Sequence, residues 1–229
     1  MSVLQKRKGA HKDTAKSAKQ HCVESDANET ALDPEQQRVV DCILAGRNVF
    51  LTGEAGVGKS LCIGQVVHDA VALKWKVAVT ATTGLAAQGL APLVERDNIV
   101  PMTVHRFSGL VPNEYNVDAL VRRVQKNRYL AKRWKETALW VIDEVSMLSP
   151  VIFVLLDRMA RALRSEPSKS FGGITMLFVG DFFQLPPVMI DPAERKHAQE
   201  LAAVRYKQQC GKADEEDESD DDDDDDDDD

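Results

Sequence analysis

The fold is decided by the stretch NVFLTGEAGVGKS, Asn48–Ser60, in which a short apolar run leads into a glycine-rich loop. Its last eight residues match the pattern G-x-x-x-x-G-K-[ST], and they stand between a predicted strand and a predicted helix, as that pattern requires. Glycines let backbone N–H groups converge on phosphate oxygens, and the dipole of the following helix favours the negative charge. The predicted nucleotide-binding residues are Gly53, Glu54, Ala55, Gly56, Val57, Gly58, Lys59 and Ser60.

Two residues of this loop carry specific chemistry. Lys59 supplies a positive charge to the β- and γ-phosphates, and Ser60 supplies a hydroxyl ligand for Mg²⁺. The loop therefore predicts a site for a nucleoside triphosphate and Mg²⁺, but it does not name a reaction.

Further apolar runs follow along the middle of the chain. They read KVAVTA, ALWVID and TMLFVGD, and helical patterns separate them. Strands that alternate with helices favour a parallel sheet covered on both faces, in which ligands bind beyond the carboxyl ends of the strands. We therefore expect residues 31–190 to form one α/β domain with a mostly parallel sheet.

The two ends of the chain differ from this middle part. Residues 1–30 are polar and lysine-rich, and we expect a disordered basic segment there. Residues 191–229 are expected to form a polar segment and a disordered acidic tail, because 15 of the 37 acids follow Ala213. The remaining 22 acids face 29 lysines and arginines, so the body is basic. A basic body with an acidic tail is typical of nucleic-acid proteins, although a merely solvating charge run explains the tail equally well.

Several classes of protein are disfavoured. No apolar run is long enough to span a membrane, and no apolar stretch near the start predicts a signal peptide. The four cysteines lack Cys-x-x-Cys spacing and the histidines add no ligand pattern, which predicts free thiols in a reducing compartment and no zinc site. The run Lys6-Arg7-Lys8 favours a nucleus over a mitochondrion, although a generic basic segment explains it better than either targeting signal.

Two more strands are predicted to end in polar side chains. The run LWVIDE ends in Asp143 and Glu144, which fit the Mg²⁺-bound water shell and a base that polarises the attacking water. The run TMLFVG is followed by Asp181 and Gln184; we expect Gln184 near the γ-phosphate, and Asp181 to hold it or a basic partner in place. A solvated pair of acids is the alternative for Asp143 and Glu144.

Gln36 has two readings. In DPEQ, Asp33 suits an N-cap, Pro34 the first helical position and Gln36 the third position of a capping box, so its place has a structural explanation. The functional reading is an amide that contacts the adenine edge of the nucleotide.

Taken together and in order, these motifs resemble those of the petite-integration-frequency (Pif) family, RecD-like DNA helicases of superfamily one. LDPEQ resembles the family's adenine-reading motif, GEAGVGKS and VIDEVSML its two nucleotide motifs, and VGDFFQLPPV its motif III. VTATTGLAA and TVHRFSGL resemble DNA-contacting motifs, and LLDRMARALR followed by FGG resembles the family signature. The resemblance runs from about Leu32 to Val188.

This resemblance implies a RecA-like motor domain that uses ATP and Mg²⁺ to move 5′-to-3′ on single-stranded DNA and to unwind duplex junctions. It also implies roles in DNA repair, recombination and telomere maintenance, in the nucleus or the mitochondrion. Hydroxyls that can contact phosphates and rings that can stack on bases make a DNA face plausible. The predicted DNA-binding residues are Thr82, Thr83, Thr103, His105 and Phe107.

The family motor has two RecA-like domains with ATP between them, and nothing here resembles motifs IV to VI. We therefore expect the chain to hold only the first motor domain, with the second domain or a subunit as a partner. The alternatives are one half of a split helicase, a non-catalytic ATP- and DNA-binding regulator, or a loading ATPase of the AAA type. The segment Gly180-Asp181-x-x-Gln184-Leu185 disfavours the last of these.

Overall fold

A computed structural model describes residues 32–54 and 56–181, together with Pro192 and Lys196. Its centre is a five-stranded sheet in the order β1-β5-β4-β2-β3, in which every pairing is parallel. The strands are β1 (Val49–Leu51), β2 (Val77–Ala81), β3 (Met102–Thr103), β4 (Leu139–Asp143) and β5 (Thr175–Val179). The register pairs Leu51 with Val179 and Ala81 with Asp143, so the carboxyl ends of these strands lie along one edge.

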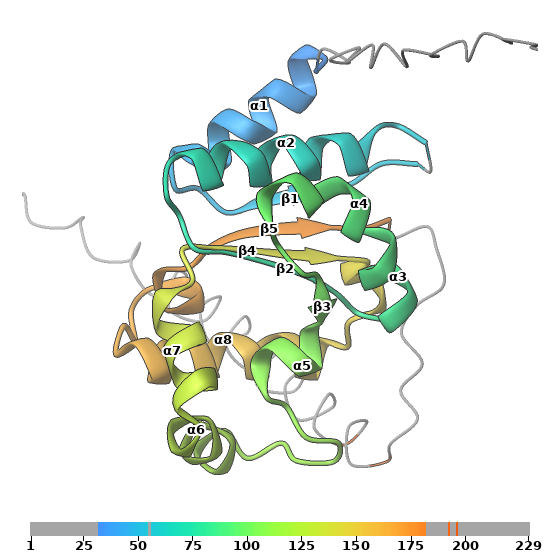
Figure 1. Ribbon diagram of the computed structural model, residues 1–229. Helices are drawn as coiled ribbons and strands as arrows, with labels where there is room; N and C mark the ends of the chain where they lie inside the picture. The colour runs from blue at the N-terminus through green and yellow to red at the C-terminus, as the bar shows by residue number, and fades with distance from the viewer. Residues whose placement is uncertain (1–31, 55, 182–191, 193–195, 197–229) are drawn as a thin grey trace, which may run out of the picture. The chain divides into compact units, whose positions relative to one another are not determined.

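Helices cover both faces of the sheet (Figure 1). One face carries α1 (Pro34–Leu44), α2 (Lys59–Ala72), α3 (Gly84–Gly89) and α4 (Ala91–Val94). The other face carries α5 (Val104–Ser108), α6 (Val117–Lys126), α7 (Arg128–Glu136) and α8 (Pro150–Arg164). Three short 3-10 turns, η1 (Glu95–Asp97), η2 (Val145–Met147) and η3 (Ser170–Gly173), complete the described elements. The expected α/β fold with helices on both faces is confirmed.

Strand residues alternate between two separate cores. On β4, Leu139 and Val141 pack under α1 and α2, whereas Trp140 and Ile142 pack against the helices of the other face. All four are fully buried. Strands of a parallel sheet that are buried on both faces read as continuous apolar runs, which is the pattern seen in the sequence.

Local capping fixes where the helices begin. At α1 the Asp33 side chain accepts hydrogen bonds from the backbone N–H groups of Glu35 and Gln36, and the Gln36 side chain accepts one from Asp33. The expected capping box is therefore present. At α8 the Ser149 hydroxyl accepts from the Ile152 N–H, and Pro150 occupies the first helical turn. Each such cap typically contributes about 1 kcal/mol.

The end of α8 is tied to two other elements by Arg164. Its guanidinium donates hydrogen bonds to the carbonyl of Gly172 in η3 and to the carbonyls of Trp134, Lys135 and Thr137 at the end of α7. A cation at a helix C-terminus satisfies carbonyls that the helix leaves unpaired. The segment that resembles the family signature therefore holds α7, α8 and η3 together.

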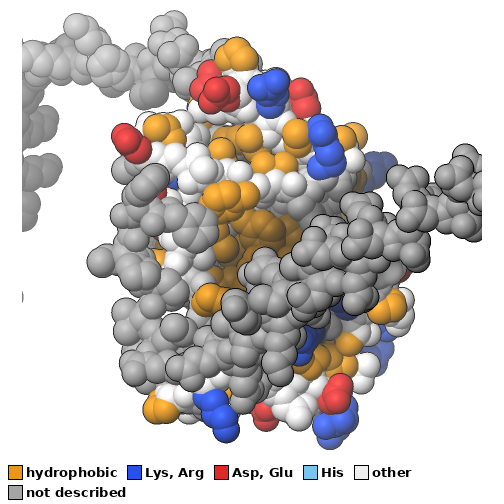
Figure 2. Space-filling model, turned by 180° about the vertical axis from the view of Figure 1, so that it is seen from behind, with side chains coloured by type: hydrophobic (Ala, Val, Ile, Leu, Met, Phe, Trp, Pro, Cys, Tyr) orange, Lys and Arg blue, Asp and Glu red, His pale blue; other side chains and the backbone are white. Residues whose placement is uncertain are grey.

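The view from behind shows hydrophobic side chains gathered in the middle of that face, with charged side chains around them (Figure 2). At the sheet edge formed by β1, Phe50 remains 44% exposed. Among the helices of the described residues, none has the length and apolar character needed to cross a membrane. The expected disordered ends, residues 1–30 and most of 191–229, lie outside the described residues.

Candidate functional site

The carboxyl ends of β4 and β5 and the start of α2 surround a cavity of about 400 Å³. Its walls bring together residues that are far apart in the sequence. They are Gly56, Gly58, Lys59, Ser60, Asp143, Glu144, Gly180 and Asp181. A cleft at this edge of a parallel sheet is where such folds bind ligands.

The glycine-rich loop holds Lys59 close to its own backbone. The Lys59 ammonium donates hydrogen bonds to the carbonyls of Gly53, at 2.6 Å, and Glu54, at 2.8 Å. Gly58 has a φ of 81° as the N-cap of α2, a conformation that favours glycine. The start of α2 thus presents backbone N–H groups and the exposed Ser60 to the cavity. Ala55 lies outside the described residues.

Gln36 uses both ends of its side-chain amide. The oxygen completes the capping box, while the nitrogen donates to the carbonyl of Val57 in the glycine-rich loop at 3.3 Å. A Cβ atom on Gly58 would lie 2.5 Å from that nitrogen. Gln36 therefore ties α1 to the loop, a contact that the two sequence readings did not include. Adenine contact stays a prediction.

Cys62 lies beneath this contact. Its side chain is fully buried, and its Sγ lies 3.8 Å from the carbonyl oxygen of Gln36. Burial raises the pKa of the Cys62 thiol to about 11, and the negative charge of Asp33 adds to the shift. The neutral thiol therefore acts as a small packing group.

Asp143 is the last residue of β4, Glu144 follows it, and both line the cavity. Burial raises the pKa of the Asp143 carboxyl; a hydrogen bond from the Glu144 backbone and the charge of Lys59 oppose this shift, and the charge of Glu144 adds to it. Glu144 has a φ of 54°, which is uncommon for a residue with a side chain. Backbone held in such a conformation occurs often at functional sites.

Thr82 holds this strained backbone from the neighbouring strand. Its hydroxyl donates to the carbonyl of Glu144, and its N–H donates to the carbonyl of Asp143, both at 3.3 Å. The sequence reading placed Thr82 on DNA and missed this link. Only the β2–β4 register, which no local motif encodes, brings the two segments together.

The end of β5 packs closely on the turn that follows Glu144. A Cβ atom on Gly180 would lie 3.1 Å from the Ser146 nitrogen and 3.2 Å from the Val145 nitrogen. A larger residue would push the two strand ends apart. Asp181 is 7% exposed and lines the cavity. Gln184, which the sequence placed near the γ-phosphate, lies outside the described residues.

The five predicted DNA-binding residues lie in different surroundings. The hydroxyls of Thr83 and Thr103 cap α3 and α5, accepting from the N–H groups of Ala86 and Arg106. His105 is exposed and remains available to a ligand.

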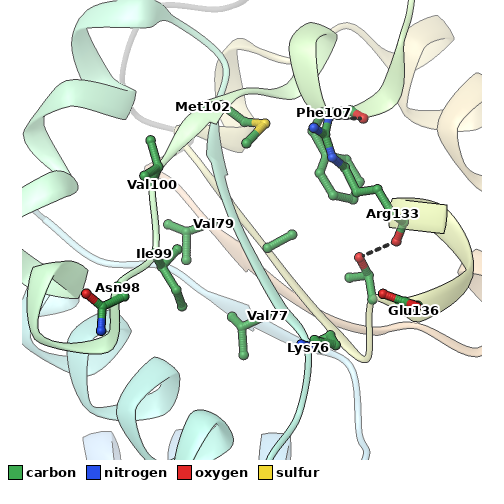
Figure 3. A pocket seen from close by; sticks show the side chains of 12 residues that line it. Lys76, Val77, Val79, Asn98, Ile99, Val100, Met102, Phe107, Arg133 and Glu136 are labelled. Atoms are coloured by element: carbon green, nitrogen blue, oxygen red, sulfur yellow. Dashed lines mark hydrogen bonds between the residues drawn. The ribbon is translucent and has the colours of Figure 1, made fainter. Parts of the chain in front are cut away.

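Phe107 contradicts its predicted role. The ring is 1% exposed and packs against Trp140, with ring centroids 4.3 Å apart. The ring lines a second cavity of about 340 Å³ along β2, and the Arg133 guanidinium lies over the ring (Figure 3). Stacking on DNA bases is therefore wrong for Phe107 in this structure, because the aromatic core already covers its ring.

The donors at the first cavity suit Mg²⁺ in part. Hydroxyl and carboxylate oxygens from Ser60 and Asp143 are the hard ligands that this ion prefers. No group of three or more His, Cys, Asp or Glu side chains that could hold a metal occurs among the described residues. These residues therefore fit an ion that takes its other ligands from phosphate and water, as Mg²⁺ usually does.

Known proteins are similar to this chain in sequence. The chain is 41% identical over 160 residues to the ATP-dependent DNA helicase PIF5 of Trypanosoma brucei brucei, and 38% identical over 163 residues to the ATP-dependent DNA helicase PIF1 of Saccharomyces cerevisiae. These matches cover 69% and 70% of this chain but only 16% and 18% of the relatives. The chain thus spans less than a fifth of their length.

Solved structures agree with this result. The crystal structure of Pif1 helicase from Candida albicans matches with a TM-score of 0.61 and 34% identity, over 69% of this chain and 34% of that one. The structure of Bacteroides sp Pif1 in complex with ADP-AlF4 matches with a TM-score of 0.59 and 27% identity, over 74% and 36% of the two chains. Both likenesses extend to the RecA-like sheet and its helices. The model of the PIF1-like helicase family matches residues 31–210, which shows that this chain belongs to that family.

Proposed function

We propose that the chain binds Mg-ATP in the first cavity and forms the ATP-binding part of a 5′-to-3′ DNA helicase. The observation that carries the proposal is the meeting of Lys59, Ser60 and Asp143 around one space at the carboxyl edge of the sheet. Support comes from the relatives, which are named ATP-dependent DNA helicases, and from the crystal structure of Bacteroides Pif1 bound to single-stranded DNA.

The proposal assigns a role to each candidate residue, and for the residues that the structure describes their position supports it. Lys59 sits where its ammonium can exchange the loop carbonyls for phosphate oxygens, and the N-terminus of α2 adds backbone donors. Ser60 and Asp143 would hold Mg²⁺, directly and through its water shell; the ion would neutralise phosphate charge. Glu144 is the candidate base that polarises the attacking water, and Gln184 is a candidate γ-phosphate contact. Gln36, which donates a hydrogen bond to the Val57 carbonyl, would carry a nucleotide contact into α1.

A second candidate function is an ATP- and DNA-binding regulator with slow turnover. One observation favours it: among the described residues that line the cavity, Lys59 is the single cation and no arginine is present. An arginine supplied to the transferring phosphate typically raises turnover by about 10³–10⁵-fold, equivalent to roughly 4–7 kcal/mol. The family resemblance implies that this arginine comes from a second motor domain or subunit.

DNA is the proposed partner, as single strands and duplex junctions. The exposed His105 and the nearby threonine caps at the starts of α3 and α5 are the described residues that support a DNA-contacting edge. The predicted nuclear location, with the mitochondrion as its alternative, agrees with a role on DNA and stays a prediction.

The test is calorimetric titration of Mg-ATP into the full 229-residue chain. Loss of charge-assisted bonds worth about 1.5–3 kcal/mol predicts that Lys59→Ala weakens binding by roughly 10–150-fold. Lys169→Ala is the matched control, because Lys169 is an exposed lysine paired with Glu166, away from the cavity. If Lys59→Ala and Lys169→Ala chains with unchanged circular dichroism bind Mg-ATP with equal affinity, the assignment of the first cavity as the nucleotide site is wrong.

Steady-state ATP turnover separates the two candidate functions. The full chain is assayed with and without a single-stranded oligonucleotide. The motor reading predicts turnover that the oligonucleotide stimulates, and the regulator reading predicts nucleotide binding with turnover near background in both conditions. Strand displacement on a 5′-tailed duplex is expected to be absent for the isolated chain under the regulator reading.

A further inference from the structure

The helices α6 and α7 form a hairpin whose outer surface is strongly basic. They lie next to each other on the side of the sheet that carries α5 and α8 (Figure 1). The two helices and the residue between them contain only two acids, Asp118 and Glu136. We call five exposed cations on them the α6–α7 basic face. They are Arg122, Arg123, Lys126, Arg128 and Lys135.

These five cations have no salt bridge among the residues that the structure describes. Their neighbour Lys132, in contrast, forms a salt bridge with Glu136 at 3.7 Å. Arg133 lies on the inner side, beside Phe107 (Figure 3). Its guanidinium donates to the carbonyls of Arg106 and Phe107. Arg133 and Lys132 thus have partners among the described residues, whereas the basic face stays open to an anionic partner.

The basic face is hollowed at one end. A cavity of about 500 Å³ lies between residues 111–114 and α6. Arg122, Arg123 and Lys126 line it together with the apolar Val111 and Leu120, and Glu114 is its single acid. Clustered arginines beside a small apolar floor are the kind of surface that recognises acidic segments.

The chain itself carries a segment of matching charge. Asp214–Glu218 and Asp220–Asp229 place 15 carboxylates within 16 residues. About 33 residues separate Asp181 from Asp214, enough to span up to roughly 110 Å when extended, whereas a domain of this size measures roughly 40 Å across. The acidic segment can therefore reach the basic face from the end of β5. Being part of the same chain, it is present at a high effective concentration.

We propose that the α6–α7 basic face is the docking surface of the acidic segment 214–229. The attraction is between fully solvated charges, so it weakens with salt on the scale of the Debye length, about 8 Å at physiological ionic strength. While docked, the acidic segment excludes other polyanions from this face. The inference concerns a surface apart from the first cavity and does not depend on ATP binding.

The first measurement is direct. The full chain is treated with a zero-length carbodiimide, which joins lysine amines to carboxylates in contact, and the products are mapped by mass spectrometry. Cross-links from Lys126 or Lys135 to residues 214–229 are expected at 50 mM salt and should disappear at 1 M. Cross-links spread evenly over surface lysines, Lys169 included, would contradict docking at this face.

The second measurement is a cycle of four full-length chains. One change replaces the 15 acids by Asn and Gln at constant length, and the other replaces Arg122, Arg123 and Lys126 by Gln. These three side chains are exposed, so folding should be preserved and circular dichroism checks it. The probe is a fluorescent oligothymidylate, used as a polyanion.

Docking predicts that neutralising the acidic segment tightens oligonucleotide binding by about tenfold or more at 50 mM salt. The log–log salt slope should steepen by roughly two, because three freed cations each release counterions. In the Arg122/Arg123/Lys126 variant this gain should vanish. If the tail change produces the same gain with and without these cations, the acidic segment acts through net charge or at another surface and the proposal is wrong.

Discussion

The two faces of the sheet are packed with different side chains. Under α1 and α2 the core is aliphatic, with Ile43, Ile63 and Val67 fully buried. On the opposite face the core is rich in aromatic rings: the Trp134 and Trp140 centroids lie 5.3 Å apart in an edge-on contact. The aliphatic face supports the glycine-rich loop through non-directional contacts. The aromatic face holds the four helices α5 to α8 in place and depends on specific ring geometry.

The rings of the aromatic face also carry polar groups that must be satisfied. The Trp140 indole donates to the Thr80 hydroxyl at 2.9 Å, and that hydroxyl donates to the Val141 carbonyl at 2.8 Å. The Trp134 indole donates to the Ser108 carbonyl at 3.1 Å. A substitution of Trp134 or Trp140 therefore loses both apolar contact and a buried hydrogen bond, whereas one at Ile63 or Val67 on the aliphatic face loses contact alone.

The largest expected effect is that of Trp134→Ala. Removing a fully buried ring is expected to lower the free energy of unfolding by about 3–5 kcal/mol. Ile63→Val on the aliphatic face is the control, with an expected loss of about 0.5–1.5 kcal/mol. Urea denaturation followed by circular dichroism measures both. Losses of similar size would show that the two faces do not differ in the way described.

A second prediction concerns Gly172, which joins η3 to α8 on the aromatic face. It has a φ of 58°, and a Cβ there would lie 2.5 Å from the Ala160 carbonyl oxygen. Gly172→Ala must displace η3 and weaken the Arg164 hydrogen bond, at an expected cost of about 2–4 kcal/mol.

The neighbouring glycine provides a matched control. Gly173 also has a positive φ, but a Cβ there would meet only the flexible end of Lys169, at 3.3 Å. Gly173→Ala should cost about 1–2 kcal/mol, from backbone strain alone. A thermal unfolding midpoint for Gly172→Ala equal to or above that of Gly173→Ala would contradict the close-packing explanation.

The same comparison explains what the sequence could predict. The glycine-rich loop, the capping box at Asp33 and Gln36 and the buried runs are local patterns, and the structure places them as expected. Phe107 was mispredicted because it stands in a segment that resembles a DNA-contacting motif. The sequence of that segment does not show whether the ring faces a DNA base or packs against two tryptophans. Its burial depends on Trp134 and Trp140, which are 27 and 33 residues away.

The hydrogen bonds that join separate elements beside the first cavity could not be predicted from the sequence either. Gln36 reaches Val57, and Thr82 reaches Glu144, over separations of 21 and 62 residues. Such contacts follow from helix packing and strand register, which a single sequence does not encode locally. The residues proposed to carry the chemistry stand in local motifs that a single sequence reveals, whereas the contacts that position them could not be predicted.

The smallest expected effect is that of Thr82→Val, at the edge where the two faces meet. The valine keeps the shape of the side chain but removes the hydroxyl that bonds the Glu144 carbonyl. Because that bond is long, at 3.3 Å, the free energy of unfolding should fall by only about 1 kcal/mol. Glu144, with its strained φ, loses one of the contacts that hold its backbone. On the proposed function, ATP turnover should then fall several-fold while the affinity for Mg-ATP stays close to that of the unaltered chain.

Thr82→Ser is the control, because serine restores the hydroxyl and should restore turnover without restoring the methyl contact. Measuring kcat and KM for both variants separates positioning from binding: a positioning role lowers kcat and leaves KM nearly constant. Thr82 was first expected to contact DNA, and that role predicts a different result, a weaker stimulation by oligonucleotide with unchanged basal turnover. Basal kcat values that are equal in Thr82→Val and Thr82→Ser would remove Thr82 from the support of Glu144, and a weaker stimulation by oligonucleotide in Thr82→Val alone would assign its hydroxyl to the DNA side.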